Sequence, residues 1–186
     1  ITKSGKLIQM VPDLYVAWHA GKSKWGNQKS LNFKSIGIEI SNPGHKYGYK
    51  AFTDNQIKCL IKLSKFIIKK YNIKKNKILG HADIAPLRKI DPGEKFPWKL
   101  LSKKKIGIWH KVNSNILKSS RGKKSEFSLK KFIFYLKKLG YHMKYSNPNE
   151  LKKIIKTFQM RFRPEITDGK LDSECYKIAK SLYNLR

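Results

Sequence analysis

The hydrophobic pattern of the chain changes character once, across residues 113–125. Before this stretch, short apolar runs typical of strands are combined with one long helix, and after it apolar residues recur only at helical spacing. The stretch itself is rich in Asn, Ser and Lys with one Gly, the composition of a linker. We therefore expect an α/β domain at 1–112, a linker at 113–125 and a small helical domain at 126–186.

The first domain carries clear strand and helix patterns. Residues 35–40 alternate three Ile with Ser, Gly and Glu, which predicts a strand with one apolar face. Thr53 and Gln56 form a capping box ahead of apolar residues at helical spacing, so a helix is expected from about 53 to 71. Residues 77–80 are predicted to be a short strand that leads into a histidine.

The second domain contains three helical segments with strong boundaries. Gly140 ends the first segment, and Asn147 followed by Pro148 begins the second. Asp172 is positioned to cap the third. Three short amphipathic helices in about 60 residues predict a small all-α three-helix bundle.

The net charge of the chain favours some kinds of binding partner but does not identify one. The chain of 186 residues has 42 Lys and Arg against 12 Asp and Glu, a net charge of +30. Such a surface attracts anionic polymers, although a general bias toward Lys, Ile and Asn explains the same numbers without any function. The sequence lacks a helix-turn-helix with a basic recognition helix and lacks aromatic RNA-binding motifs, so we expect no nucleic-acid partner. No apolar run approaches the ~20 residues of a membrane helix, so no membrane span is expected.

The segment 80–93 concentrates the groups that carry chemistry. A catalytic zinc ion takes three protein ligands from histidine and carboxylate side chains, and His81 and Asp91 are two candidates. Lys89 precedes Asp91 by two residues, so in extended backbone both side chains point to one side, where the ammonium group can stabilise an oxyanion. The alternative is a loop pinned by an Asp–Lys pair, with His81 as an ordinary strand-end histidine.

Two further residues are candidates outside that segment. Glu39 shares a strand face with Ser35 and Gly37, whose small side chains leave room for a substrate beside a general base. A solvent-facing strand residue is the alternative. His19, between Trp18 and a small-residue pair, is a candidate of the same kind, with a packed histidine as the alternative.

Four motifs in register make the first domain resemble a known family. It is similar to the zinc-dependent N-acetylmuramoyl-L-alanine amidases of the peptidoglycan-recognition-protein-like family, over roughly residues 1–109. The resemblance implies an α/β fold with a central, mostly parallel mixed β-sheet flanked by helices. The motifs are Ala17-Trp18-His19-Ala20-Gly21, Ser35-Ile36-Gly37-Ile38-Glu39-Ile40, Gly80-His81-Ala82-Asp83-Ile84-Ala85-Pro86 with Arg88-Lys89 and Asp91-Pro92-Gly93, and Phe96-Pro97-Trp98.

The resemblance implies a zinc site. His81 and Asp91 match two of the zinc ligands of the family, and the third, a histidine, is expected a few residues upstream of Ile1. Two ligands hold zinc more weakly than three. A non-catalytic peptidoglycan-binding protein with an incomplete metal site is therefore the alternative to an enzyme.

The resemblance also implies the reaction and its remaining residues. The expected reaction is hydrolysis of the amide bond between the lactyl group of N-acetylmuramic acid and the L-alanine of the peptidoglycan stem peptide. Glu39 is expected to be the catalytic acid and base, and Lys89 to steady the oxyanion. His19 and Arg88 are expected to line the substrate groove.

The C-terminal domain has a likeness of its own. Residues 136–141, 158–163 and 166–172 are similar to the three-helix peptidoglycan-binding domain that often accompanies wall hydrolases. The expected partners are therefore peptidoglycan or its muropeptide fragments. The expected location is the bacterial cell envelope, with a role in cytoplasmic recycling as the alternative.

Overall fold

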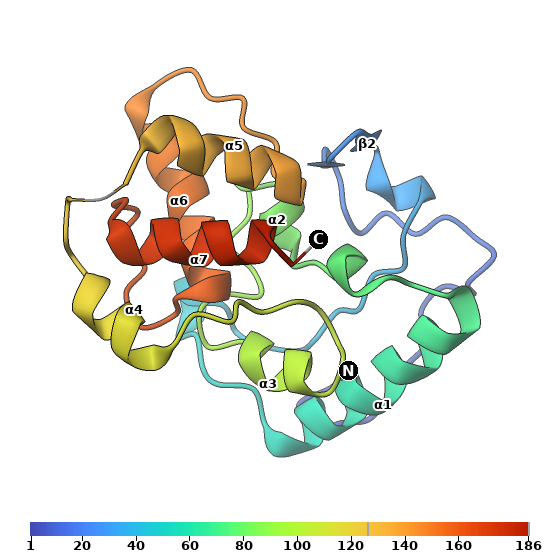
Figure 1. The fold of residues 1–186 in the computed structure, drawn as a ribbon. Helices are drawn as coiled ribbons and strands as arrows, with labels where there is room; N and C mark the ends of the chain where they lie inside the picture. Colours follow the sequence, from blue (N-terminus) through green and yellow to red (C-terminus); the bar gives the residue numbers. More distant parts are fainter. Residues whose placement is uncertain (126, 186) are drawn as a thin grey trace.

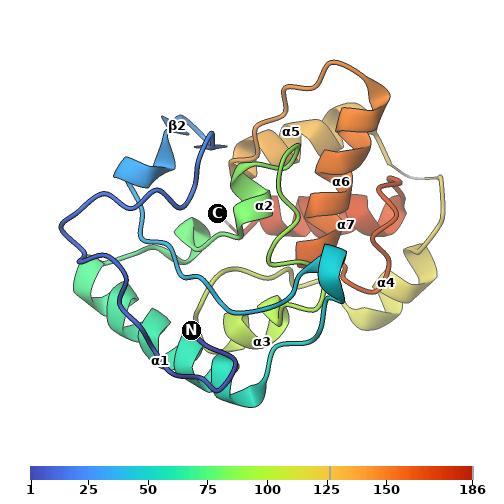
Figure 2. The same cartoon turned by 180° about the vertical axis from the view of Figure 1, so that it is seen from behind.

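A computed structural model describes residues 1–125 and 127–185, which form seven α-helices and one small antiparallel sheet in an α/β fold. In Figures 1 and 2, α5, α6 and α7 gather on one side of the molecule, α1 lies on the opposite side, and α2 lies between them. The helices are α1 (Asp54–Tyr71), α2 (His81–Ile84), α3 (Trp98–Lys103), α4 (Ser114–Ser120), α5 (Leu129–Leu139), α6 (Pro148–Phe162) and α7 (Ser173–Tyr183). The strands are β1 (Lys24–Trp25) and β2 (Gln28–Lys29), and three 3-10 helices are η1 (Leu31–Phe33), η2 (His45–Tyr47) and η3 (Lys75–Lys77).

The described residues contain one antiparallel strand pair and one pair of hydrogen bonds of the parallel type. β1 and β2 pair antiparallel, with Lys24 opposite Lys29. Elsewhere the Ile1 amino group donates to the Glu39 carbonyl at 2.7 Å, and the Ser41 amide donates to the Ile1 carbonyl at 2.9 Å. This reciprocal pair has the offset of neighbouring parallel strands.

The α/β class expected from the sequence is confirmed, but the sheet of the described residues is smaller than expected. Apart from the pair at Ile1, residues 35–40 and 77–80 have no hydrogen-bonded ladder within 1–125 and 127–185, and η3 occupies part of the second stretch. The alternation of side chains shows that a strand has an apolar face. It does not show which other strand will pair with it, because pairing depends on distant segments.

The predicted helix boundaries are confirmed. The Thr53 hydroxyl accepts from the Gln56 amide at 3.2 Å, and the Gln56 side chain accepts from the Thr53 amide at 3.0 Å, which is the expected capping box. The Asn147 side chain caps α6, and the Asp172 side chain caps α7. Gly140 follows α5 with φ of 123°, a backbone conformation that favours glycine.

The stretch expected as a linker contains a helix. Within 113–125, α4 begins where the Asn113 side chain accepts from the Asn115 amide at 2.8 Å. At its other end Ser120 is buried and its hydroxyl accepts from Lys177 of α7 at 2.8 Å. Packing on α7 stabilises a helix that composition alone does not indicate. The division into domains at 1–112 and 126–186 stays a prediction.

The main hydrophobic core joins both halves of the chain. Ala20, Trp25 and Leu31 belong to the same buried cluster as Phe132 and Phe158 of the C-terminal helices. A Cβ at Gly140 would lie 2.5 Å from the Trp25 ring, so the end of α5 lies directly on the β1 side chain. A second cluster underlies α1 and α3, and its buried members are Ile57, Leu60, Phe96, Trp98, Leu101 and Ile106.

Two further features of the described residues are the character of their helices and the state of their cysteines. None of the helices within 1–125 and 127–185 has the length and apolar character needed to cross a membrane. Cys59 and Cys175 are free thiols. Burial raises the pKa of the Cys175 thiol to about 12, which keeps it protonated.

Candidate active site

His81 and Asp91 come together at the start of α2. Gly80 is the N-cap, so His81 is the first helical residue, and the Ala82 amide is free of a partner within the helix. That amide donates instead to the Asp91 carbonyl at 2.8 Å, which brings the chain back onto the start of the helix. The two side chains then lie 3.0 Å apart, measured from His81 Nδ1 to Asp91 Oδ2.

The electrostatics of the pair favour an ionised carboxylate. Burial acts to raise the pKa of Asp91, but the hydrogen bond with His81 and the nearby Lys89 charge lower it, and the net pKa lies below the ordinary value. The Asp91 side chain remains 56% exposed and the His81 side chain 16%, so the carboxylate is open to solvent. Across residues 1–125 and 127–185, no group of three or more His, Cys, Asp or Glu side chains is placed to hold a metal ion.

The Ala20 carbonyl links two of the predicted site residues. It lies 3.2 Å from His81 Nε2 and accepts from Arg88 Nη2 at 2.8 Å. Arg88 Nη2 also donates to the Lys22 carbonyl at 3.2 Å, and a Cβ at Gly21 would lie 3.1 Å from this atom. Arg88 therefore holds the 20–22 backbone beside His81, in addition to any contact with substrate.

His19 packs against the extended segment 35–40, which also carries Glu39. A Cβ at Gly37 would lie 2.6 Å from the His19 ring, so only glycine allows this close approach. Glu39 lies two residues further on and is exposed, with no hydrogen bond or ion pair to its carboxylate within the described ranges. The structure therefore leaves this carboxylate available to a substrate.

Asp83 is a buried residue of the site that the sequence did not single out. Its carboxylate accepts from the Gly80 amide at 2.7 Å and from the Tyr141 hydroxyl at 2.5 Å, and it forms an ion pair with Arg161. Burial and the Asp83 charge raise the pKa of Tyr141 well above its usual range, so the phenol stays a donor. An acid at the third position of a helical turn was the available sequence clue.

A second group missed by sequence reasoning holds the turn after Asp91. The Tyr49 hydroxyl donates to the Pro92 carbonyl at 2.6 Å and accepts from the Lys95 amide at 3.1 Å. A Cβ at Gly93 would lie 2.7 Å from the same hydroxyl. His45, to which the sequence assigned no role, stacks on Tyr49 with ring centroids 4.2 Å apart. No local pattern predicted this contact, because it joins segments more than 40 residues apart.

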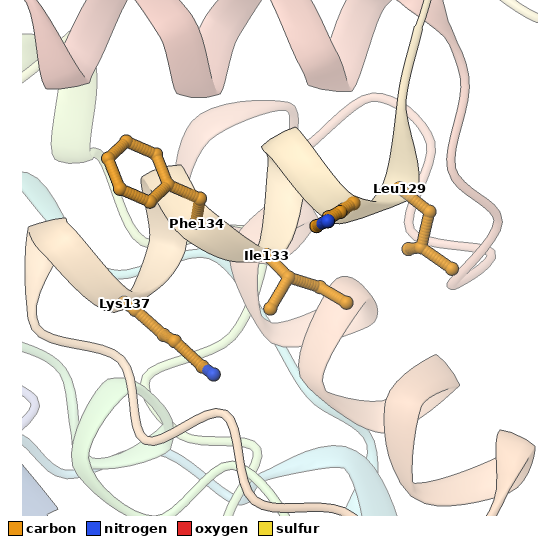
Figure 3. Close-up of a pocket in the computed structure, with 5 residues that line it drawn as sticks. Leu129, Ile133, Phe134 and Lys137 are labelled. Carbon is orange, nitrogen blue, oxygen red and sulfur yellow. The ribbon is translucent and has the colours of Figure 1, made fainter.

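A shallow hollow on the surface lies away from the 80–93 segment. It runs along one face of α5, and Figure 3 shows aliphatic, aromatic and lysine side chains from this single helix. It contains no residue of the 80–93 segment, so we locate the candidate site by its chemistry and not by the hollow. The lining residues are Leu129, Lys130, Ile133, Phe134 and Lys137.

Comparison with known proteins assigns the chain to a class of protein. The sequence family described as N-acetylmuramoyl-L-alanine amidase matches residues 1–94. The chain is 39% identical over 185 residues to N-acetylmuramoyl-L-alanine amidase AmiD of Escherichia coli, which covers 95% of this chain and 67% of AmiD. It is 40% identical over 100 residues to 1,6-anhydro-N-acetylmuramyl-L-alanine amidase AmpD of Haemophilus influenzae, which covers 53% of this chain and 52% of AmpD.

Solved structures of amidases are similar to this chain over nearly its whole length. A complex of AmiD from E. coli superimposes with a TM-score of 0.86 at 36% identity, covering 97% of this chain and 73% of the AmiD chain. AMPDH3 from Pseudomonas aeruginosa gives a TM-score of 0.86 at 32% identity, covering 96% of this chain and 72% of its own.

The fold and these matches together define the class of protein as an amidase of mixed α/β architecture. The chain belongs to the family of N-acetylmuramoyl-L-alanine amidases. The family and the amidase function expected from the four sequence motifs are thereby confirmed. The chain spans about half the length of the AmpD relative and 67% of the length of AmiD.

Proposed function

We propose that the chain hydrolyses the amide bond between the N-acetylmuramic acid lactyl group and L-alanine with the help of a zinc ion held by His81 and Asp91. The observation that carries this proposal is the 3.0 Å approach of His81 Nδ1 to Asp91 Oδ2. AmiD and AMPDH3 were solved in complex with anhydromuramyl peptides, which supports muropeptides as the ligand class here.

The two side chains fit zinc by their chemistry. An imidazole nitrogen and an ionised carboxylate oxygen are zinc donors at about 2.0–2.2 Å, and two such donors can share one ion only when they are neighbours, as they are here. When bound, zinc supplies Lewis-acid chemistry that polarises the scissile carbonyl. We propose a histidine upstream of Ile1 as the third ligand, on the basis of the sequence resemblance alone.

We assign proton transfer to Glu39. Its exposed carboxylate has no described partner, and the His19 ring lies over the neighbouring Gly37. Glu39 takes a proton from the attacking water and delivers it to the departing alanine nitrogen. Proton transfer by a positioned carboxylate typically contributes about 10²–10⁴ to the rate.

Lys89 and Arg88 provide positive charge around the reacting carbonyl. Lys89 lies near enough to Asp91 for its charge to lower the pKa of that carboxyl. In our proposal the Lys89 ammonium stabilises the oxyanion of the tetrahedral intermediate. Arg88 and His19 line the substrate groove, with Arg88 also fixing the Ala20 carbonyl.

We propose that the protein acts in the bacterial cell envelope, and that residues 126–186 contribute to binding peptidoglycan. The net charge of +30 suits a polymer whose stem peptides carry carboxylates, and salt screens this attraction. Recycling of wall fragments in the cytoplasm is the alternative location.

The test is to incubate the full chain with purified peptidoglycan and with a soluble anhydromuropeptide, and to detect free stem peptide by mass spectrometry. We expect release from a zinc-loaded sample, loss of release with a chelator, and recovery when zinc is restored. Binding to peptidoglycan without release in any sample would replace the enzyme with the non-catalytic binding protein.

A further inference from the structure

The helical turn α2, which carries His81, is too short to be stable without contacts to the rest of the protein. α2 has four residues, and a single turn of helix is unstable without outside contacts because its nucleation is unfavourable. The orientation of the His81 side chain therefore depends on what holds Gly80 and Asp83. These anchors come from the C-terminal half of the chain.

Arg161 of α6 contacts residues on both sides of His81. Its guanidinium pairs with Asp83, which follows His81, and its Nη2 atom donates at 2.9 Å to the carbonyl of Ile78, which precedes His81. The guanidinium also lies over the Trp98 ring, 4.1 Å from its centroid. Arg161 is 3% exposed and Asp83 2% exposed, so this is a buried ion pair with fixed geometry.

Tyr141 completes the anchor from the segment after α5. Its buried hydroxyl donates to Asp83 Oδ1 at 2.5 Å, while Asp83 Oδ2 accepts from the Gly80 amide at 2.7 Å. The Asp83 carboxylate thus connects Tyr141, in the C-terminal half of the chain, to Gly80, the residue directly before His81. Figures 1 and 2 show α2 lying against this side of the molecule.

We propose that Arg161 and Tyr141, acting through Asp83, are positioning residues for the zinc ligand His81. The C-terminal helices then support the active site as well as any wall contact. This inference rests on the proposed zinc site. Changes in residues that orient a metal ligand typically weaken metal affinity about 10–100-fold.

The test uses the mild variants Arg161→Lys and Tyr141→Phe in the full chain. Both keep the size of the side chain, and the first keeps its charge, so Asp83 is not left as an unpaired buried charge. The matched control is Arg163→Lys. Arg163 is 2% exposed and pairs with Asp172 and Glu174 inside the C-terminal bundle, without a described contact to Asp83.

Two measurements are made on each protein. Zinc affinity is determined by competition with a chromogenic chelator, and amide exchange of Ala82 is followed in the metal-free protein. We expect about tenfold weaker zinc binding and faster Ala82 exchange in both variants, because the Ala82 amide bonds to the Asp91 carbonyl only when the turn is held. The control should match the parent in both measurements, even where its melting temperature falls.

Equal Ala82 exchange and equal zinc affinity in parent and variants would overturn the inference. So would an equal effect of the control, which would show a general loss of bundle stability. A parent protein that releases no stem peptide, combined with the expected exchange differences, would instead contradict the proposed function and leave the positioning role supported.

Discussion

The Nδ1 atom of His81 lies 3.0 Å from the Oδ2 atom of Asp91, although nine residues, among them Pro86, separate the two in the sequence. The contact gives the site an ionised carboxylate beside an imidazole. Zinc sites use this combination of donors. The roles of the surrounding residues can be separated by experiments that measure metal content and turnover independently.

Asp91→Ala and Lys89→Met should affect the protein in different ways. Asp91 supplies the anionic donor, so its loss should remove most bound zinc. Lys89 is cationic and does not ligate zinc while protonated, so its loss should spare zinc content and lower turnover roughly 10²–10³-fold. Metal analysis beside stem-peptide release measures both effects, with Lys103→Met of α3 as a charge-matched control. Undiminished zinc in Asp91→Ala would remove Asp91 from the ligand set.

Glu39→Gln should abolish most turnover without loss of zinc. The amide keeps the shape of the side chain but cannot accept the proton of the attacking water, so the rate should fall about 10²–10⁴-fold. Steady-state release of stem peptide and metal content provide the measurement. Asp54→Asn, which removes a carboxylate from the first turn of α1, should keep the parental rate. A near-normal rate for Glu39→Gln would favour the solvent-facing alternative for this residue.

Gly140→Ala should destabilise the fold sharply. The new methyl group would lie 2.5 Å from the Trp25 ring, and φ at this position is 123°. Overpacking and backbone strain together should cost roughly 2–4 kcal/mol. Gly122→Ala is the control, because φ there is also positive at 72° but no atom lies within 4 Å of the added group. Thermal unfolding compares Gly140 with a positive-φ glycine in open space, and equal melting temperatures of the two variants would contradict the packing.

His110 should make the protein less stable in mild acid. Burial first, and the Lys99 charge second, lower the pKa of His110 from 6.5 to about 4. Between these two values the unfolded chain binds a proton that the folded chain does not, so stability falls as the pH is lowered from about 6.5 toward 4. The loss from pH 7 to pH 5 should be about 1–2 kcal/mol.

The measurement is urea unfolding at pH 7 and pH 5, comparing the parent with His110→Gln. Glutamine has no proton to gain, so the variant should show a smaller loss of stability between the two pH values. His19→Gln serves as a control at a histidine that stands apart from this buried setting. The same loss in the parent and in His110→Gln would rule out this origin of acid sensitivity.

The sequence by itself determined the local features of the fold. The Thr53–Gln56 capping box, the caps Asn147 and Asp172, and helix-ending Gly140 act through groups a few residues apart. The starts of α1, α6 and α7 and the end of α5 could therefore be predicted from the sequence. His81 and Asp91 could be named as candidate zinc ligands from the sequence, because both lie in one short segment whose motif resembles that of the amidase family.

Only the tertiary structure decided the long-range partners. The helix α4 forms within an expected linker because it packs on α7, and the segment 35–40, expected as a strand, pairs only at its end, with Ile1. Asp83 meets Arg161 across 78 residues of sequence. A capping bond is set by neighbouring backbone dihedrals, whereas a buried ion pair depends on where two distant segments are brought when the whole core packs.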